Sequence, residues 1–547
     1  MDKNKHRFSP LVMSLCVILG ILVGTFYTRH FSGNRLSIIN TRENKLNQLL
    51  QTIDNQYVDS VNINQLIEDA MPMILSELDP HSSYISVKDA EAANADLKGS
   101  FSGIGITFTV PNDTVIVNRV IKEGPSERVG LQFGDRILSA DGKSLIKMSQ
   151  DSIMQHLRGP KGSKVKLSVL RRGFSKPKNF TLVRGDIPVY SIESSYVING
   201  HIGYVRVKKF AETTYQEFMI ALAELSAEGI DGLIVDLRGN TGGYMHIATQ
   251  MVNEFLSEQQ LILYTEGRKS PREEYHSDGR GTFQKLPLTV LIDEVSASAS
   301  EIFAGAIQDN DRGTVVGRRS FGKGLVQQPM EFKDGSSIRL TIARYYTPSG
   351  RCIQKPYTMG HDKEYENDII ERYQRGEFFT QDSIKQNGNP FKTRLGRTVY
   401  DGGGISPDIF IPQDTLNLTS YYREAVFNGH VREFVFLYAD KNNARLSQFE
   451  NYVELENYLR KQNLLNAFAT FAERRGLRRR SLMLQKSQRL FEQAIYGGII
   501  YDILGENPYQ QYLNISDPTV LRATQVLEAR ESWPKQQKGR TGSVNQS

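Results

Sequence analysis

The sequence predicts a multidomain α/β protein with helical regions at both ends. Three observations carry this prediction. The chain has 547 residues, which is too many for one hydrophobic core. Residues 99–185 alternate short strand patterns with glycine turns, and residues 186–412 alternate buried strands with helical patterns. The segments before and after them space their apolar residues three and four apart, as helices do.

The N-terminus carries a candidate membrane segment. The uncharged run LVMSLCVILGILVGTFY, residues 11–27, follows Lys3, Lys5 and Arg7. This is the layout of a signal sequence or signal anchor, and with its flanks the run approaches the ~20 residues that cross a bilayer. No small-residue cleavage site follows, so we expect residues 1–35 to be an uncleaved anchor. The alternative is a buried core helix.

Composition narrows the functional classes. A net charge of +6 over this length argues weakly against a dedicated nucleic-acid binder, and we expect no nucleic-acid partner. The only cysteines are Cys16 and Cys352, so the part after the anchor has no internal disulfide. Asp79, His81 and His276 lack metal-ligand spacing. We therefore expect neither a metal nor a cofactor.

Helical spacing dominates residues 36–98, for example at Leu46, Leu49, Leu50, Ile53 and Tyr57, until LDPHSSYIS breaks it at residues 78–86. Residues 99–185 then form a compact unit of strands, such as GSFSGIGITFTV and KVKLSVLRR, around one helical stretch. In 186–412 the strands are expected at 203–207, 232–238 and 288–293, with a helix at 215–229. The polar stretch 355–395 reads as a surface insertion.

The chain becomes helical again over residues 413–534 and ends in a polar tail, 535–547, that we expect to be disordered. Within the helical region the run ERRGLRRR, residues 473–480, is most often a solvated helix face.

The stretch DEVSASASEIF, residues 293–303, lies at a strand-to-helix turn. Ile302, Phe303, Ala306 and Ile307 form one apolar stripe of the helix that follows. The N-terminus of a helix offers free N–H groups that stabilise an oxyanion, so one of the serines is a candidate nucleophile. The alternative is structural, because Ser298 with Glu301 fits a capping box.

Two further turns bear on this choice. Gly242 and Gly243 follow the strand GLIVDLR and let a substrate approach bare N–H groups, although a glycine-rich turn also cradles phosphates. There is no G-x-G-x-x-G motif and no Walker lysine. His246 and His276 lack a recognisable triad setting. Lys323, between two glycines, is either a solvated turn residue or a base, and a neutral amine requires its pKa to fall by about 3 units.

Four motifs in order, DLRGNTGG, SASASEIFAGAIQD, GRRSFGKGLVQ and RYYTPSGRCIQ, closely resemble the carboxyl-terminal processing proteases, which are tail-specific serine peptidases with a Ser-Lys dyad. LDPHSSY and DGGGISPD fit as well, so the resemblance covers about residues 40–412. It implies a PDZ domain at 99–185, placed before an S41-type peptidase core at 186–412 with a crotonase-like, ClpP-like α/β fold.

The resemblance also implies roles for single residues. Ser298 would be the nucleophile and Lys323 the general base, with Gln327 orienting the lysine and Glu301 supporting the site. The oxyanion hole would combine the N–H of Ala299 with one from Gly242 or Gly243. In the PDZ domain, SGIGI matches the carboxylate-binding loop, and the implied peptide-binding residues are Gly103, Ile104, Gly105, Ile106 and Arg158. A plain surface role for Arg158 stays open.

The implied function is a membrane-anchored serine endopeptidase that binds the C-terminal tails of proteins and cleaves them through an acyl-enzyme. Its body would lie on the periplasmic side of the inner membrane, and the terminal helices suggest a homodimer. Two other classes are possible: a PDZ scaffold with an inactive protease fold, and a crotonase-like lyase acting on acyl-CoA. The presence of both Ser298 and Lys323 argues against the first, and neither residue has an evident task in the second.

Overall fold

The computed structural model describes residues 44–384 and 388–530. Contacts divide the chain into two compact units, Met1–Glu77 and Leu78–Ser547, which are treated separately below. The predicted anchor, residues 1–35, and the predicted tail, 535–547, lie outside the described residues. Within the described ranges no helix is long and apolar enough to cross a membrane.

The described part of the first unit consists of α3 (Lys45–Gln56) and α4 (Ile63–Ser76). Each helix starts at an asparagine cap, since Asn44 Oδ1 accepts from Leu46 N at 3.0 Å and Asn62 Oδ1 accepts from Gln65 N at 3.2 Å. The predicted helical region 36–98 is divided after Glu77. Its last part belongs to the second unit, as β1 (Ser83–Ile85) and α5 (Val87–Lys98).

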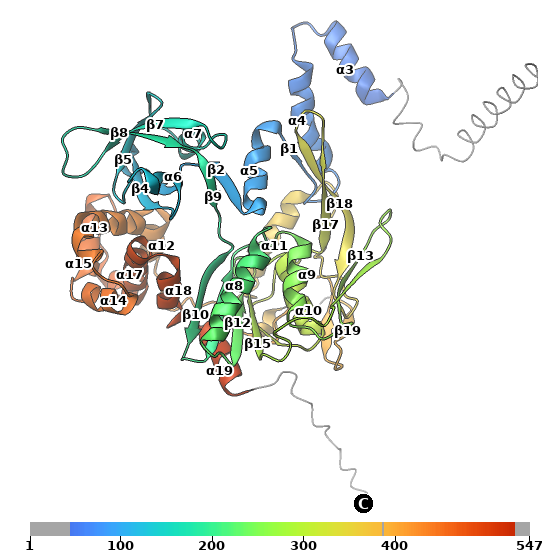
Figure 1. Ribbon diagram of the computed structural model, residues 1–547. Coiled ribbons are helices and arrows are strands. Elements are labelled where there is room, and N and C mark those ends of the chain that lie inside the picture. Colours follow the sequence, from blue (N-terminus) through green and yellow to red (C-terminus); the bar gives the residue numbers. More distant parts are fainter. Residues whose placement is uncertain (1–43, 385–387, 531–547) are drawn as a thin grey trace, which may run out of the picture. The chain divides into compact units, whose positions relative to one another are not determined.

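Residues 99–185 form a β-rich unit (Figure 1), and buried apolar residues give it a core of its own. Its sheet has the order β3-β4-β5-β7-β8, with β6 beside β5. The strands are β3 (Ile106–Thr109), β4 (Val115–Val120), β5 (Arg136–Ala140), β6 (Lys143–Ser144), β7 (Lys164–Leu170) and β8 (Lys178–Val183). They are joined by η1 (Pro111–Asp113), α6 (Pro125–Arg128) and α7 (Gln150–Leu157). A ribbon of β2 (Ser100–Gly103) and β9 (Gly185–Pro188) closes the unit where the chain enters and leaves it.

A six-stranded sheet forms the centre of the α/β region. Its order is β10 (Ile192–Ile198), β11 (Ile202–Val207), β12 (Gly232–Asp236), β15 (Leu288–Ile292), β16 (Thr314–Gly317) and β21 (Ile409–Phe410). All neighbours from β11 to β21 are parallel, and β10 is antiparallel. The apolar strands β12, β15 and β16 are buried along their whole length, as strands covered on both faces are.

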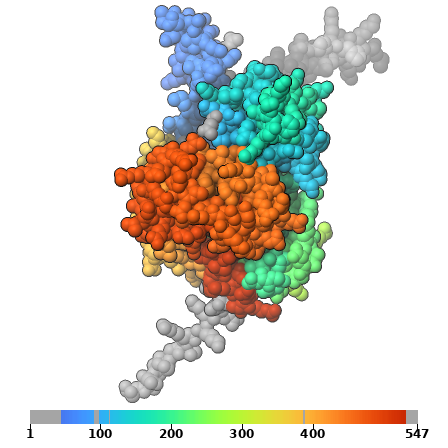
Figure 2. All heavy atoms as spheres, turned by 90° about the vertical axis from the view of Figure 1, so that its left-hand side faces the viewer, coloured from blue at the N-terminus to red at the C-terminus, as the bar shows by residue number. Residues whose placement is uncertain are grey.

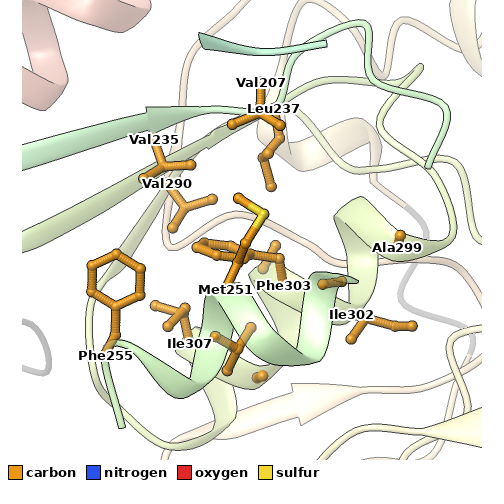
Figure 3. Packing of buried hydrophobic residues seen from close by; sticks show 14 of the residues in the cluster. Val207, Val235, Leu237, Met251, Phe255, Val290, Ala299, Ile302, Phe303 and Ile307 are labelled. Atoms are coloured by element: carbon orange, nitrogen blue, oxygen red, sulfur yellow. The ribbon is translucent and has the colours of Figure 1, made fainter. Parts of the chain in front are cut away.

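One face of this sheet is covered by α8 (Thr214–Ala227), α9 (Met245–Asn253) and α10 (Ala299–Asp309). Figure 3 shows Ile302, Phe303 and Ile307 of α10 packed with Met251 and with valines of the sheet. Every residue of α10 is buried. The helix that begins at the predicted nucleophile is therefore held on all sides.

The opposite face is covered by α19 (Pro518–Glu528), the last described helix. Its Val520, Ala523 and Leu527 form one apolar cluster with residues of the sheet such as Tyr204 and Leu291. The sequence prediction assigned this helix to a separate C-terminal region. The fold shows that a segment more than 100 residues beyond β21 completes the core of the α/β region.

A second, five-stranded sheet borders the first. It contains β1, β13 (Leu261–Glu266), β14 (Glu273–His276), β17 (Leu325–Glu331) and β18 (Ser337–Tyr346). β17 and β18 form an antiparallel hairpin, and β1 pairs with the far side of β18. Lys323 lies two residues before the start of β17. The sequence prediction missed β1, because three residues are too short to show a strand pattern.

The segment 355–395, predicted as a surface insertion, is exposed over most of its described residues, but it also contains regular elements and buried side chains. It contains α11 (Asp362–Gln374), η2 (Gln381–Ser383) and β19 (Pro390–Lys392), and β19 pairs with β20 (Thr398–Tyr400). Arg372 on α11 is only 1% exposed and donates to the carbonyl oxygens of Arg319 and Ser320 at 2.7 and 3.0 Å. Its charge is matched by Glu377 at 2.9 Å. This helix therefore covers the loop that leads to Lys323.

The predicted helical C-terminal region, whose surface is orange in Figure 2, has an apolar core of its own. Its helices are α12 (Ser420–Phe427), α13 (His430–Leu446), α14 (Tyr452–Arg460), α15 (Leu464–Arg474), α16 (Ser481–Lys486), α17 (Gln488–Leu504) and α18 (Glu506–Asn514). Asp440 of α13 accepts from Arg136 of the β-rich unit at 3.1 Å, and Asn507 of α18 accepts from Ser194 of β10 at 2.6 Å. The multidomain α/β class expected from the sequence is confirmed.

Candidate active site

Two of the three alternating serines have structural tasks. Ser296 Oγ donates to the carbonyl oxygen of Leu237 at 2.8 Å, and Ser300 Oγ donates to that of Asn240 at 2.8 Å. Both side chains are fully buried, and both tie this turn to the glycine-rich turn after β12. Ser298 lies between them and is partly exposed. It is thus the serine of this stretch that is placed to react.

Ser298 occupies the N-cap position of α10 with φ 55° and ψ −114°. A positive φ is strained for a residue with a side chain, and such strain clusters at functional sites. The conformation persists because α10 is buried and the turn before it is fixed by Ser296 and Ser300. The N-terminus of α10 therefore lies directly beside the serine hydroxyl.

The loop that carries Lys323 is bound to the start of α10 by Glu301. Oε2 of Glu301 accepts from the N–H of Ser298 at 2.9 Å and from the N–H of Lys323 at 2.8 Å. Oε1 accepts from Gly322 N at 2.7 Å and from Ser320 Oγ at 2.5 Å. The resemblance implied that Glu301 supports the site, and these four hydrogen bonds are the contacts that its carboxylate makes there. One carboxylate joins the backbones of the predicted nucleophile and the predicted base.

Tyr345 of β18 makes a second link between the same two residues. Its hydroxyl lies 2.6 Å from the carbonyl oxygen of Lys323 and 3.2 Å from that of Ser298. The side chain is buried. Three segments that are distant in sequence therefore meet at Ser298 and Lys323.

Burial sets the electrostatics of this pair. It lowers the pKa of Lys323 below the usual lysine value, and the positive charge of Arg339 lowers it further, while Glu301 and Asp79 act in the opposite direction. Burial also raises the pKa of Glu301, although four donors favour its charged form. A lysine amine with a lowered pKa is a proton acceptor nearer neutral pH.

The glycine-rich turn approaches Ser298 closely. A Cβ on Gly242 would lie 2.8 Å from Cβ of Ser298, which is closer than real Cβ contacts, and 3.1 Å from the nitrogen of Ala299, which is a tight contact. A Cβ on Gly243 would lie 2.2 Å from the carbonyl oxygen of Phe210. Both glycines have positive φ, 106° and 146°. No other residue fits at either position without a shift of the backbone.

The N–H groups of this turn are not equivalent. That of Gly242 donates to Asn240 Oδ1 at 2.8 Å. Among the hydrogen bonds of the described residues, none uses the N–H of Ala299 or of Gly243. Of the two glycines that the resemblance offered for the oxyanion hole, Gly243 is therefore the one with a donor available beside Ala299 in this structure.

Gln327 lies in β17, next to a register shift between Val326 and Gln327. Its side-chain amide donates to Thr341 Oγ1 at 3.3 Å, and Thr341 Oγ1 in turn donates to Asp79 Oδ1 at 3.0 Å. The side-chain amide of Gln327 is thus linked through Thr341 to Asp79 of the LDPHSSY segment. The orienting role of Gln327 toward Lys323 stays a prediction.

The predicted peptide-binding residues of the β-rich unit lie together. Gly103 ends β2, Ile106 begins β3, and Ile104 and Gly105 form the turn between them, with Gly105 at φ 77°. β3 is the terminal strand of its sheet. Arg158, at the end of α7, places its guanidinium 4.4 Å from the ring centre of Phe101, beside this turn. The loop and the arginine are therefore neighbours at an open sheet edge.

Sequence reasoning missed several residues of the site. Asn240 holds the glycine-rich turn after β12, because its side chain accepts from Gly242 N. Ser320 holds the loop before Lys323, because its Oγ donates to Glu301 and accepts from Ile405 N at 2.6 Å. Tyr345 lies within RYYTPSG, which is part of a motif that carries the family resemblance, but the resemblance assigned no role to this tyrosine. Periodicity could not reveal these roles, because each depends on contacts between distant segments.

Three family models match parts of this chain. The model of peptidase family S41 matches residues 201–364, that of a PDZ domain matches 102–182, and that of a family of unknown function matches 421–505. The chain is 36% identical over 315 residues to the carboxy-terminal processing protease CtpB of Bacillus subtilis, covering 57% of this chain and 65% of that protein.

Two further relatives are matched over a larger share of their length. The carboxy-terminal-processing protease of Bartonella bacilliformis is 35% identical over 315 residues, covering 57% of this chain and 72% of that protein. The carboxyl-terminal-processing protease of Synechocystis is 33% identical over 383 residues, covering 65% of this chain and 87% of that protein.

Proposed function

We propose that this chain, which belongs to the family of carboxy-terminal processing proteases, is a serine endopeptidase that uses Ser298 as nucleophile and Lys323 as general base. The observation that carries the proposal is the shared acceptor: Oε2 of Glu301 binds the N–H groups of both residues, at 2.9 and 2.8 Å. This contact keeps the serine and the lysine adjacent while both side chains stay free to react.

Acylation would proceed as follows. The neutral amine of Lys323 takes the proton of Ser298 Oγ, and the oxygen attacks the carbonyl carbon of the scissile peptide. The N–H groups of Ala299 and Gly243 stabilise the oxyanion that forms. The lysine ammonium then gives its proton to the leaving amine, the C–N bond breaks, and an ester remains on Ser298.

Deacylation repeats the same transfers with water. Lys323 takes a proton from a water molecule, which attacks the ester carbonyl, and the same N–H groups hold the second oxyanion. The proton returns to Ser298 Oγ as the ester bond breaks. The product leaves as a carboxylate, and the enzyme is restored.

Substrates would be recognised by their C-terminal tails. Support comes from the open edge of β3, where an extended peptide can add a strand, and from the turn Ile104–Gly105, whose N–H groups face a terminal carboxylate in this binding mode. Arg158 supplies a positive charge beside the same turn. A free carboxylate distinguishes a chain terminus from internal sequence, so this site would select tails.

The test is cleavage of an unstructured protein with an apolar C-terminus by purified variants. Ser298→Ala and Lys323→Met are expected to lose activity, whereas Ser226→Ala, which removes an exposed hydroxyl of α8, is expected to retain it. Retained cleavage in Ser298→Ala or Lys323→Met would refute the mechanism. Absence of cleavage by the unmodified protein, on substrates with different tails, would favour the inactive scaffold.

We also propose that residues 1–35 anchor the chain in the inner membrane, with the protease on the periplasmic side. Support comes from the apolar run at 11–27 behind Lys3, Lys5 and Arg7. Cell fractionation and protease accessibility in spheroplasts test this. Recovery of the full chain in the soluble cytoplasmic fraction would contradict it.

A homodimer through the N-terminal helices is proposed as well. On α3 and α4 the apolar residues Leu46, Leu49, Met73 and Ile74 are exposed, and an exposed apolar stripe on a helix is a common association surface. Light scattering measures the mass of the wild-type protein and of Leu49→Glu with Met73→Glu. A monomeric wild type would contradict the proposal.

A further inference from the structure

A chain of hydrogen bonds runs from the residue after the base to a histidine far away in sequence. The N–H of Gly324, which follows Lys323, donates to Oε1 of Gln354 at 2.8 Å. Nε2 of Gln354 donates to the hydroxyl of Tyr365 at 3.3 Å, and that hydroxyl lies 2.9 Å from Nε2 of His81. Gln354 and Tyr365 are buried.

The donors and acceptors along this chain of hydrogen bonds allow one placement of the protons. The amide of Gln354 uses both of its N–H bonds, one toward Tyr365 and one toward the carbonyl oxygen of Lys355 at 2.9 Å. Because the hydroxyl of Tyr365 accepts from Gln354, its own proton is available to Nε2 of His81. That nitrogen is an acceptor only when the imidazole is neutral and carries its proton on Nδ1.

The surroundings of His81 favour the neutral ring. Burial is the largest cause that lowers the pKa of His81, to about 4; Lys323 and Lys355 lower it when their amines are charged, and Asp79 acts in the opposite direction. The ring of Tyr365 packs edge-on against the imidazole, with centroids 5.2 Å apart. The last link of the chain is therefore kept throughout the neutral range.

This chain of hydrogen bonds and Glu301 both hold the base loop, which we define as residues 318–324 between β16 and β17. Glu301 binds Gly322 and Lys323 from α10, while Lys355 N donates to the carbonyl oxygen of Gly322 at 2.9 Å and Gln354 binds Gly324. Hydrogen bonds thus fix the backbone on both sides of Lys323. A shift of even 1 Å in such a group costs much of its catalytic effect.

We propose that Gln354, Tyr365 and neutral His81 are positioning residues for Lys323, which hold its loop so that the amine stays desolvated at Ser298. The inference rests on the proposed function of these two residues. His81 lies two residues before β1, and Tyr365 lies on α11. Neither the motifs nor the mechanism assigned a role to these two residues.

The first test is Tyr365→Phe, which removes one hydroxyl and keeps the ring. We expect kcat to fall about five- to tenfold, the effect of one lost hydrogen bond, with KM nearly unchanged. The midpoint of the pH–rate profile should rise, because a looser loop lets water reach the amine and returns its pKa toward the ordinary value. A merely smaller folded fraction would lower the rate without moving this midpoint.

The second test compares two substitutions of His81. His81→Gln places an amide where Nε2 stands and can still accept from Tyr365, whereas His81→Asn places it at the position of Nδ1. The readout is the rate at which a fluorophosphonate labels Ser298, measured from pH 6 to pH 10 (about the range of the lysine titration). We expect His81→Gln to resemble the wild type and His81→Asn to resemble Tyr365→Phe.

Equal rates and midpoints for the two His81 variants would overturn the proposal, and so would a wild-type profile for Tyr365→Phe. The His81 pair decides the question even if Tyr365→Phe does not fold. Failure of the proposed function gives a different result, since the wild type would then cleave no tail and Ser298 would take up no label.

Discussion

The amide nitrogens of Ser298 and Lys323 donate to one and the same atom, Oε2 of Glu301. The two residues belong to different turns, one before α10 and one before β17, and neither turn fixes the other by local geometry. The buried carboxylate of Glu301, together with the hydroxyl of Tyr345, therefore holds the backbones of the proposed nucleophile and the proposed base next to each other. It also explains why S-x-x-E at this position is more than a helix cap.

Glu301→Gln tests this link. The amide nitrogen of glutamine must replace one of two oxygens that each accept two hydrogen bonds, so buried N–H donors lose their acceptor. We expect the free energy of unfolding to fall by about 1–3 kcal/mol and the labelling of Ser298 to slow strongly. Urea denaturation and labelling kinetics measure the two effects. Glu274→Gln, in an exposed pair with Arg272, is the matched control and should change neither.

The pH dependence of acylation should report on Lys323. The lysine is active when neutral, so kcat/KM is expected to rise with pH, with its midpoint below the ordinary lysine pKa of about 10.4. Lys323→Arg keeps a cation but cannot lose its proton, and should be inactive at every pH. Stopped-flow or labelling rates across pH provide the profile. A midpoint at or above the ordinary value would contradict the role of burial.

The same shift makes a prediction about stability. Since the pKa of Lys323 is lower in the folded state, the unfolded chain binds more protons between the two values, and stability rises with pH across that window. Below the folded pKa the full penalty of a buried charge is present. Lys323→Met should therefore be more stable than the wild type at neutral pH, and the difference should shrink as the pH approaches the ordinary lysine value. Thermal unfolding at several pH values measures it.

Gly242→Ala should abolish activity, because its Cβ would lie 2.8 Å from that of Ser298. We expect a loss of more than about 100-fold in kcat, the cost of displacing a reacting group by roughly 1 Å. Gly239→Ala is the matched control: it has φ 70° and no atom within 4 Å of the added Cβ. Only the backbone cost of about 1 kcal/mol should appear there. Comparable kinetics for the two variants would contradict the proximity of Gly242 to the nucleophile.

Val520→Asp tests the role of α19 in the core. Val520 is 2% exposed and packs on the sheet, whereas its neighbour Leu521 is 45% exposed. A buried, unpaired carboxylate should destabilise the fold by several kcal/mol, while Leu521→Asp should change stability by less than about 0.5 kcal/mol. Melting temperatures of both variants check this. Equal melting temperatures would show that the last helix is not part of the core.

The sequence determined the local elements and the chemistry. Buried apolar runs gave β11, β12 and β15 because both faces of the sheet are covered, and the stripe Ile302, Phe303, Ala306 and Ile307 gave α10 because one face must pack. The order of the motifs predicted Ser298 and Lys323 as the catalytic pair. These features depend on residue type and short-range spacing, which a single sequence contains.

Only the tertiary structure decided how distant segments share the site. It showed that Ser296 and Ser300 are bound to Leu237 and Asn240, whereas Ser298 is partly exposed, and that the side chain of Asn240 accepts from the N–H of Gly242. It also showed that α11, in a polar segment, covers the base loop, and that α19 packs on the sheet as part of the core. Hydrogen bonds and burial between residues far apart in sequence have no period, and so no local pattern encodes them.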